Sequence, residues 1–286
     1  MSTPLRVAGH RGKRPAKRLP LRFASEYARE PFPSPSYPVD VTSGITDWRM
    51  LGNGPDPTCT VRPDGCGDCT FAGREHYKMA KAAAAGETEQ WESSNALVEE
   101  YLAYDHGQDE GAVIADLLMS WYDAGKILAF APVDHTDKAE MDAAMQAFNG
   151  LYVGVSLTSD ADELFQEGLP WTLANGEQPD PSEGHCIVKV KASGQGLDGY
   201  VTWGAEQPAT EGWSAACLDE AWVIITSDDA PVDLPKLRAD IDALHGEGGS
   251  GQPPAPAPHP SALHEVAADL RALITKAEQL LEAIGL

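Results

Sequence analysis

Two cysteines three residues apart are the first residues in this sequence that could carry chemistry. They are Cys66 and Cys69, in the stretch "RPDGCGDCTFAGREHYKMAKAAAA" at residues 62–85. The stretch predicts a helix from Cys69, because alanine is dense, Asp68 can serve as N-cap and Gly86 follows the last alanine. Three chemistries use such cysteines: zinc binding, thiol–disulfide exchange and nucleophilic catalysis.

A zinc site would take four ligands from this region. Cys59, Cys66, Cys69 and His76 follow the spacing C-x6-C-x2-C-x6-H, and thiolate and imidazole are the usual zinc ligands. On one helix, however, Cys69 and His76 would lie about 10 Å apart along the axis, at 1.5 Å per residue. A tetrahedral ion would have to span two turns, so we expect no bound metal.

A redox pair is the second interpretation, since a C-x-x-C motif at a helix start has a lowered thiol pKa. That motif normally follows a buried strand, whereas here "PTCTVRPDG" precedes it. Five cysteines, an odd number, also argue against a disulfide framework and fit a reducing compartment, although one bridge is possible.

The third interpretation takes Cys69 as a nucleophile. Unpaired amides and the dipole at a helix N-terminus favour a thiolate, and the Cys69 amide can donate to an oxyanion. The imidazole would come from His185 in "EGHCIVKV", at the start of a predicted strand after a glycine. Thr202, in "GYVTWGAEQ", lies on the next predicted strand and could orient the ring of His185.

The elements that must position these residues divide the chain in two. Apolar periodicity predicts helices at residues 69–85, 93–107, 109–127 and 138–150. Short runs rich in Val, Ile and Tyr predict strands at 151–158, 185–192, 199–204 and 221–227. Helices first and strands second indicate an α+β fold with an antiparallel sheet half.

Charge is distributed very unevenly along the chain. The net charge is −23, yet residues 1–22 hold seven Lys and Arg and no acid, which leaves 14 basic against 44 acidic residues elsewhere. Such a basic arm either docks on an acidic surface, on nucleic acid or on the protein's own body, or is a disordered tail that keeps the protein in solution. The acidic body makes nucleic-acid binding by the main domain unfavourable. Without a long apolar run, we expect no membrane insertion and no secretion signal.

Composition predicts five regions. They are a basic, Pro-rich extended arm (1–44), the α+β domain (45–230), a short amphipathic helix (231–246), a Gly/Pro linker (247–260) and a heptad helix (261–286). In the last region apolar residues recur at alternating steps of three and four: Leu263, Val266, Leu270, Leu273, Ala277, Leu280 and Ile284. That seam predicts a homo-oligomeric coiled coil or a helix docked on a partner, with a helix folded back on its own body as the alternative.

Three segments together resemble the papain-like cysteine peptidases over residues 45–227. "GCGDCTFA" is similar to the segment in which the nucleophile opens a long central helix, "GHCIVKV" to the histidine strand, and "TWGAEQPATEGW" to the Asn-Ser-Trp-Gly segment. The resemblance implies a papain-like fold with Cys69 as nucleophile, His185 as base and Trp203 shielding the contact between His185 and Thr202. Thr202 stands where that family carries asparagine.

A closer resemblance concerns the residues before the nucleophile. "DWRMLGN" followed by "GDCTFAG" is similar to a divergent papain-like group found in actinobacterial bacteriophages. On that pattern Asn53 donates to the oxyanion, because Pro63 occupies the place of the family's glutamine. Asp68, beside the thiol, would raise the pKa of Cys69 through its negative charge.

These patterns predict a virion-associated head or tail protein that hydrolyses amide bonds through Cys69 and His185 without a cofactor. The basic arm and the C-terminal helix would attach it to other virion proteins, as a homo-oligomer, in the virion or in the host cytoplasm during assembly. Two alternatives are an inactive papain-like binding or structural module and a free cysteine peptidase.

Overall fold

The fold was analysed on a computed structural model, which describes residues 11–42, 45, 47–51, 59, 65–87, 91–174, 176–194, 196–227 and 230–247. Asn53, Pro63, the predicted linker and the predicted heptads lie outside the described residues.

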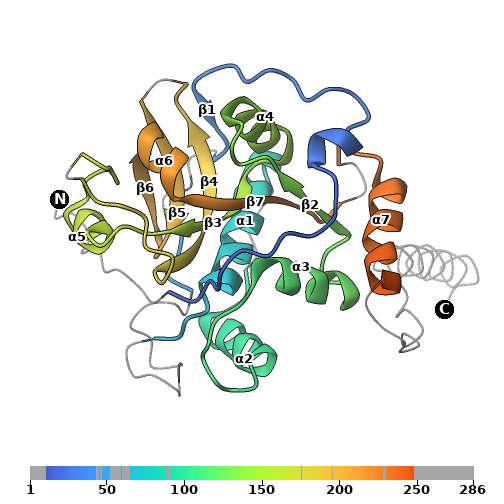
Figure 1. Ribbon diagram of the computed structural model, residues 1–286, viewed down its shortest axis with the longest axis horizontal. Coiled ribbons are helices and arrows are strands. Elements are labelled where there is room, and N and C mark those ends of the chain that lie inside the picture. The colour runs from blue at the N-terminus through green and yellow to red at the C-terminus, as the bar shows by residue number, and fades with distance from the viewer. Residues whose placement is uncertain are drawn as a thin grey trace, which may run out of the picture.

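An antiparallel sheet forms one half of the molecule (Figure 1). In the described residues its strands are β1 (Val39–Asp40), β2 (Ala129–Val133), β3 (Leu151–Ser156), β4 (Gly184–Ala192), β5 (Leu197–Thr202), β6 (Ala205–Thr210) and β7 (Leu218–Ile225). The strand order is β2-β7-β3-β4-β5-β6, and β1 pairs with β4. The fold class is therefore α+β, as the order of helical and strand patterns predicts.

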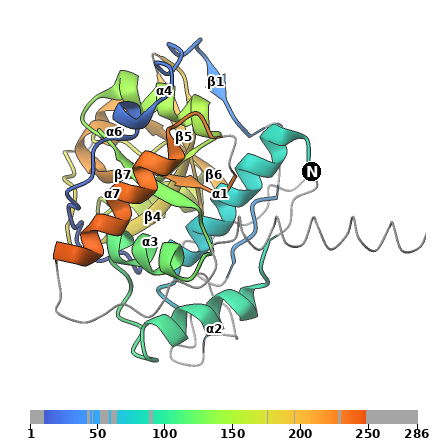
Figure 2. The ribbon, with the colours of Figure 1, turned by 90° about the vertical axis from the view of Figure 1, so that its right-hand side faces the viewer.

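Helices surround this sheet. They are η1 (Ala24–Tyr27), α1 (Cys69–Ala85), α2 (Ser94–Tyr104), α3 (Ile114–Asp123), α4 (Lys138–Phe148), α5 (Ala161–Glu167), α6 (Glu211–Cys217) and α7 (Leu234–Glu247). α1 packs on β3 and β4, whereas α7 contacts β2 at the far end of the sheet. Figures 1 and 2 show α1, α2 and α3 gathered on one side of the molecule, away from α5 and α6. In the described chain, none of these helices is long and apolar enough to cross a bilayer.

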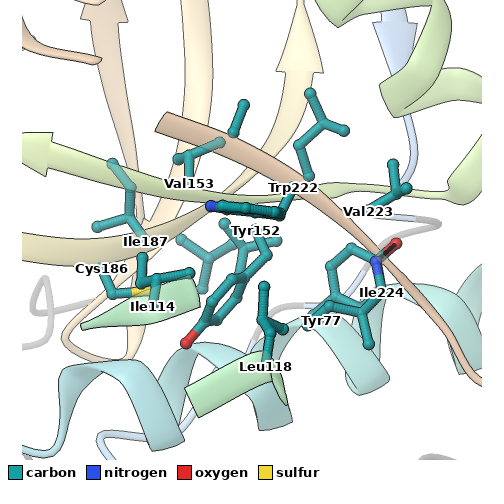
Figure 3. Close-up of a cluster of buried hydrophobic side chains, with 14 of the residues drawn as sticks. Tyr77, Ile114, Leu118, Tyr152, Val153, Cys186, Ile187, Trp222, Val223 and Ile224 are labelled. Carbon is teal, nitrogen blue, oxygen red and sulfur yellow. Dashed lines mark hydrogen bonds between the residues drawn. The ribbon is translucent and has the colours of Figure 1, made fainter. Parts of the chain in front are cut away.

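The central helix α1 begins and ends where the sequence predicts. It starts at Cys69 and stops at Gly86, whose φ of 68° forms a left-handed C-cap. One face of α1 packs on the sheet, where the Tyr152 hydroxyl donates to the Thr70 carbonyl oxygen at 2.6 Å. Figure 3 shows Tyr152 pointing from its strand toward the helices, with Cys186 and Tyr77 on either side. These contacts fix the height of α1, and so of Cys69, above β3 and β4.

Two strands that the sequence did not predict lie at the edges of the sheet. β2 contains Pro132 and β6 contains Pro208, and proline lacks the amide that a central strand needs. Both strands are terminal in the strand order, which is where proline is tolerated. The short helices α5 and α6 were also not predicted, and α3 begins later than expected, after the left-handed residues Asp109 and Gly111.

Candidate functional site

The first pair of the candidate site is His185 with Thr202. His185 is the second residue of β4 and Thr202 the last of β5. The His185 Nε2 atom lies 2.7 Å from the Thr202 Oγ1 atom, so the hydroxyl oxygen can accept a hydrogen bond from a protonated Nε2. The His185 Nδ1 atom is buried and has no hydrogen-bond partner among the described residues. An imidazole held at Nε2 with Nδ1 unoccupied is arranged to accept a proton at Nδ1.

A tight hairpin places Trp203 on the histidine ring. Trp203 and Gly204 connect β5 to β6 and both have positive φ, 45° and 74°, as two-residue hairpin turns require. The Trp203 ring stacks on His185 with centroids 4.8 Å apart. Phe165 packs edge-on against Trp203 at 4.9 Å. This aromatic packing orients the imidazole and keeps water from the bond between His185 and Thr202.

Cys69 reaches the same place from α1. As the first residue of that helix it is buried, and its thiol lies close to the backbone of Cys186, the residue after His185, which lowers the pKa of the thiol. Burial raises the pKa of the Cys69 thiol from 9.0 to about 12, and the charge of Asp68 adds to this rise. Burial, and then the charge of Arg11, lowers the pKa of His185 well below its usual 6.5. With these shifts, the Cys69 thiol and the His185 imidazole are both uncharged at neutral pH.

Asp68 occupies the N-cap position of α1 and is fully buried. Its carboxylate does not accept the capping hydrogen bond from a backbone amide that an N-cap residue usually accepts. Its backbone carbonyl instead accepts from the amides of Phe71 and Ala72, at 2.8 and 3.0 Å. Asp68 thus stabilises the start of α1 through its backbone carbonyl, and its charged side chain raises the pKa of the Cys69 thiol.

A disulfide decides between the roles of the clustered cysteines. Cys59 and Cys66 are bonded to each other, while Cys69 remains a free thiol. The bonded sulfurs cannot serve together as zinc thiolates, and Cys66 is not the redox partner of Cys69. The fourth residue of the zinc pattern, His76, bonds the Arg49 carbonyl oxygen at 2.9 Å through its Nε2 atom. This is the single bridge that the cysteine count left possible.

The basic arm lies across the site. The dark blue segment in Figure 1 crosses α1 and α3 before it reaches η1. The backbone of its Gly12 lies close to the Cys69 thiol and lowers the pKa of that thiol. A Cβ atom on Gly12 would stand 1.4 Å from the carbonyl oxygen of Gly67. Only a residue without a side chain fits between the thiol and that carbonyl.

Backbone hydrogen bonds hold the arm on both sides of the thiol. The Ala112 amide donates to the Gly12 carbonyl oxygen at 2.7 Å, and the Arg14 amide donates to the Ala112 carbonyl oxygen at 2.8 Å. On the other side the Lys13 amide donates to the Gly184 carbonyl oxygen at 3.2 Å. The arm is bound as an extended peptide between α3 and β4.

Charged side chains anchor the same segment. Arg11 pairs with Asp162 and Glu183, and its guanidinium lies 5.4 Å from the centre of the Trp203 ring. The Lys13 ammonium lies 2.6 Å from Asp219, and its side chain is 1% exposed. Of the three surfaces that the sequence allowed for the arm, its described part contacts the protein's own body.

Sequence reasoning identified Cys69, His185, Thr202, Trp203 and Asp68. The structure places His185, Thr202 and Trp203 in contact with one another, and Cys69, which follows Asp68, close to the backbone of Cys186, the residue after His185. Sequence reasoning did not identify Gly12 and Lys13, although a glycine among basic residues in "GHRGKRP" was a signal that part of the arm lies close to backbone. The proposed oxyanion donor Asn53 lies outside the described residues.

Comparisons with known proteins concern the fold that carries this site. No protein-family profile and no curated protein matches the sequence. Among solved structures, xylellain, a cysteine protease from Xylella fastidiosa, aligns with a TM-score of 0.56 at 12% identity, over 79% of this chain and all of xylellain. Digestive procathepsin L 3 of Tenebrio molitor larval midgut aligns with a TM-score of 0.50 at 11% identity, over 77% of this chain and 76% of its own. The chain therefore has the fold of the papain-like cysteine proteases.

Proposed function

We propose that this protein is a cysteine peptidase that is held closed by its own N-terminal arm. The observation that carries the proposal is the 2.7 Å contact between His185 Nε2 and Thr202 Oγ1. It leaves the buried Nδ1 atom without a hydrogen bond among the described residues, while the Cys69 thiol lies close to the backbone of Cys186, the next residue along β4. A nucleophile, a base and a group that orients the base are the three parts of thiol acyl transfer.

The proposed hydrolysis of a peptide bond proceeds in the following steps. His185 Nδ1 takes the proton of Cys69 Sγ, and the thiolate attacks the carbonyl carbon of a peptide bond. The Cys69 amide, at the start of α1, donates to the oxyanion, with Asn53 as the second donor proposed from the sequence. The imidazolium returns its proton to the departing amine, and a water molecule, deprotonated by His185, then hydrolyses the thioester.

Closure by the arm accounts for the unfavourable electrostatics of the site. Burial is the largest cause both of the raised pKa of Cys69 and of the lowered pKa of His185. When the arm leaves, water takes the position of Gly12. The pKa values of Cys69 and His185 then move toward their usual ranges. Proton transfer from thiol to imidazole becomes less costly in the open state.

Alkylation of Cys69 tests the proposal on the full chain. In Gly12→Ala the new methyl group collides with the Gly67 carbonyl oxygen, so the arm must lift. We expect iodoacetamide, followed by peptide mass spectrometry, to modify Cys69 about tenfold faster in G12A than in the native chain, because the site opens locally. Adding Thr202→Val to G12A should slow this reaction about tenfold, by removal of one hydrogen bond to the ring.

Two controls accompany that measurement. Gly212→Ala adds a methyl group that meets nothing within 4 Å, so it should leave the reactivity of Cys69 at the native level. Adding His185→Ala to G12A should lower hydrolysis of a generic peptide substrate about 100-fold or more, because the general base is lost. Equal alkylation of Cys69 and Cys217 in G12A would refute an activated nucleophile.

We further propose a virion-associated setting for this peptidase, on the sequence similarity of "DWRMLGN" and "GDCTFAG" to the bacteriophage group. The heptad pattern at 261–286 supports attachment and self-association, in the virion or in the host cytoplasm during assembly. An inactive binding module stays the alternative, and alkylation of Cys69 that does not depend on His185 would favour it.

A further inference from the structure

The Lys13 side chain occupies a buried acidic site beside the thiol. We define the Lys13 site by Gly154 and Ser156 of β3 and by Asp219 and Glu220 of β7. The ammonium lies 2.6 Å from Asp219 and 3.7 Å from Glu220. A lysine that is 1% exposed gives up its hydration, so the surrounding oxygens must replace it.

The protein itself holds these oxygens in place. Ser156 donates to Asp219 Oδ2 at 2.9 Å, and the Trp222 indole donates to Glu220 Oε2 at 2.8 Å. The other oxygen of Glu220, Oε1, is buried and has no hydrogen-bond partner among the described residues, and 3.7 Å from Lys13 is too long for one. The site therefore retains an acceptor that Lys13 does not fully use.

Shape restricts what can enter. Any Cβ atom on Gly154 would stand 2.4 Å from Lys13 Cε and 2.8 Å from Glu220 Cγ. Glycine at this position thus leaves a channel for an unbranched aliphatic stem with its charge at the far end. Lysine has this shape.

The main chain beside the site is built to take a peptide from outside. When the arm leaves, the amide and carbonyl of Ala112 and the carbonyl of Gly184 lose their partners. An extended peptide bound by strand-type hydrogen bonds would replace them, with its side chains read by adjoining pockets. Since Gly12 lies on the thiol, the next side chain along such a peptide points to the Lys13 site.

We propose that the Lys13 site is the specificity pocket of this peptidase and selects peptide substrates with a lysine side chain next to the residue over Cys69. This inference rests on the proposed function. In the closed state Lys13 of the arm occupies the place of the substrate's lysine. Burial raises the pKa of Glu220 and the charge of Lys13 opposes that rise, so an empty site favours a new cation over a neutral group.

The test uses the full chain carrying Gly12→Ala and peptidyl vinyl sulfone probes. The probes share a glycine backbone, with lysine or its uncharged isostere norleucine at each position in turn before the reactive group. At one position we expect the lysine probe to modify Cys69 about 10- to 100-fold faster than the norleucine probe, which is the effect that hydrogen bonds to a charged group usually have. Adding Asp219→Asn and Glu220→Gln should abolish that ratio, whereas Glu183→Gln, an acid that pairs with Arg11 instead, should preserve it.

The possible failures are distinguishable. Equal rates for lysine and norleucine at every position, with Cys69 modified, overturn the inference and leave the peptidase intact. No modification of Cys69 by any probe overturns the proposed function as well. If G12A does not fold, Lys13→Ala removes the stem and the cation that hold the arm over the site, and the same ratios are measured in that variant.

Discussion

Two buried histidines, His185 and His76, make the folded state sensitive to acid. Burial lowers the pKa of His185 well below 6.5 and also lowers that of His76. Below pH 6.5 the unfolded chain binds protons at these residues and the folded chain does not. Their contribution to stability is therefore complete above pH 6.5 and is lost as the pH falls toward their folded pKa values.

Urea unfolding at several pH values checks this. Between pH 7.5 and 5.5 we expect the free energy of unfolding to fall by about 1 kcal/mol through His185, and by less through His76, whose pKa is lowered less. His76→Gln, which keeps a donor for the Arg49 carbonyl, should remove the smaller part of that fall. His106→Gln changes an exposed residue and should leave it unchanged. A free energy that does not vary over this range would contradict the burial of both rings.

At the residue scale, local signals in the sequence were sufficient to single out the side chains of the candidate site. Cys69 at a helix start, His185 at a strand start and Thr202 before Trp-Gly each stand at a recognisable boundary between elements. Lys13 carried no such signal, because a lysine among basic residues indicates long-range charge and not a buried contact with Asp219, more than 200 positions away.

At the element scale, close packing of α1 against the sheet sets the position of the nucleophile. A Cβ atom on Gly73 would stand 3.0 Å from the Tyr152 ring and 3.1 Å from Cys186 Sγ. The helix therefore approaches β3 and β4 closely at this residue, one turn from Cys69. A larger side chain would push α1 away from His185.

Gly73→Val tests that packing. We expect it to lower the free energy of unfolding by about 1–3 kcal/mol, as overpacked cores do, in a urea titration. Gly212→Val, in α6, places its side chain where a Cβ atom meets nothing within 4 Å, and should change stability much less. Equal effects of the two substitutions would show that close approach at Gly73 is unimportant.

The sequence pattern predicted the elements in the interior of the fold, and it did not predict the strands at the edges of the sheet. α1 and β3 were predicted within two residues at each end, since each carries its own apolar pattern. β2 and β6 contain Pro132 and Pro208, and the turn between β5 and β6 uses Trp-Gly instead of the commoner Asn-Gly. Whether a strand lies at the edge depends on the assembled sheet, and a short stretch of sequence does not show the order of the strands.

At the scale of the whole molecule, the predicted heptads make self-association the main expectation. Residues 261–286 lie outside the described residues, so this prediction rests on the sequence alone. Deleting them should reduce the molar mass measured by multi-angle light scattering to that of a monomer of the shortened chain. The full-length double variant Leu270→Asp and Leu273→Asp, which keeps the length and breaks the seam, should do the same. A native chain that is already monomeric would contradict the heptad argument.

In the proposed peptidase, the glycine contact over Cys69 makes closure and catalysis unequal targets for mutation. Activity needs several particular side chains, and each can be lost separately. Closure instead needs a hydrogen atom in place of a side chain at residue 12, where even a methyl group would meet the Gly67 carbonyl. Every amino-acid change at that codon inserts a Cβ atom. A genetic selection for constitutive activity should therefore recover many different substitutions at this one codon.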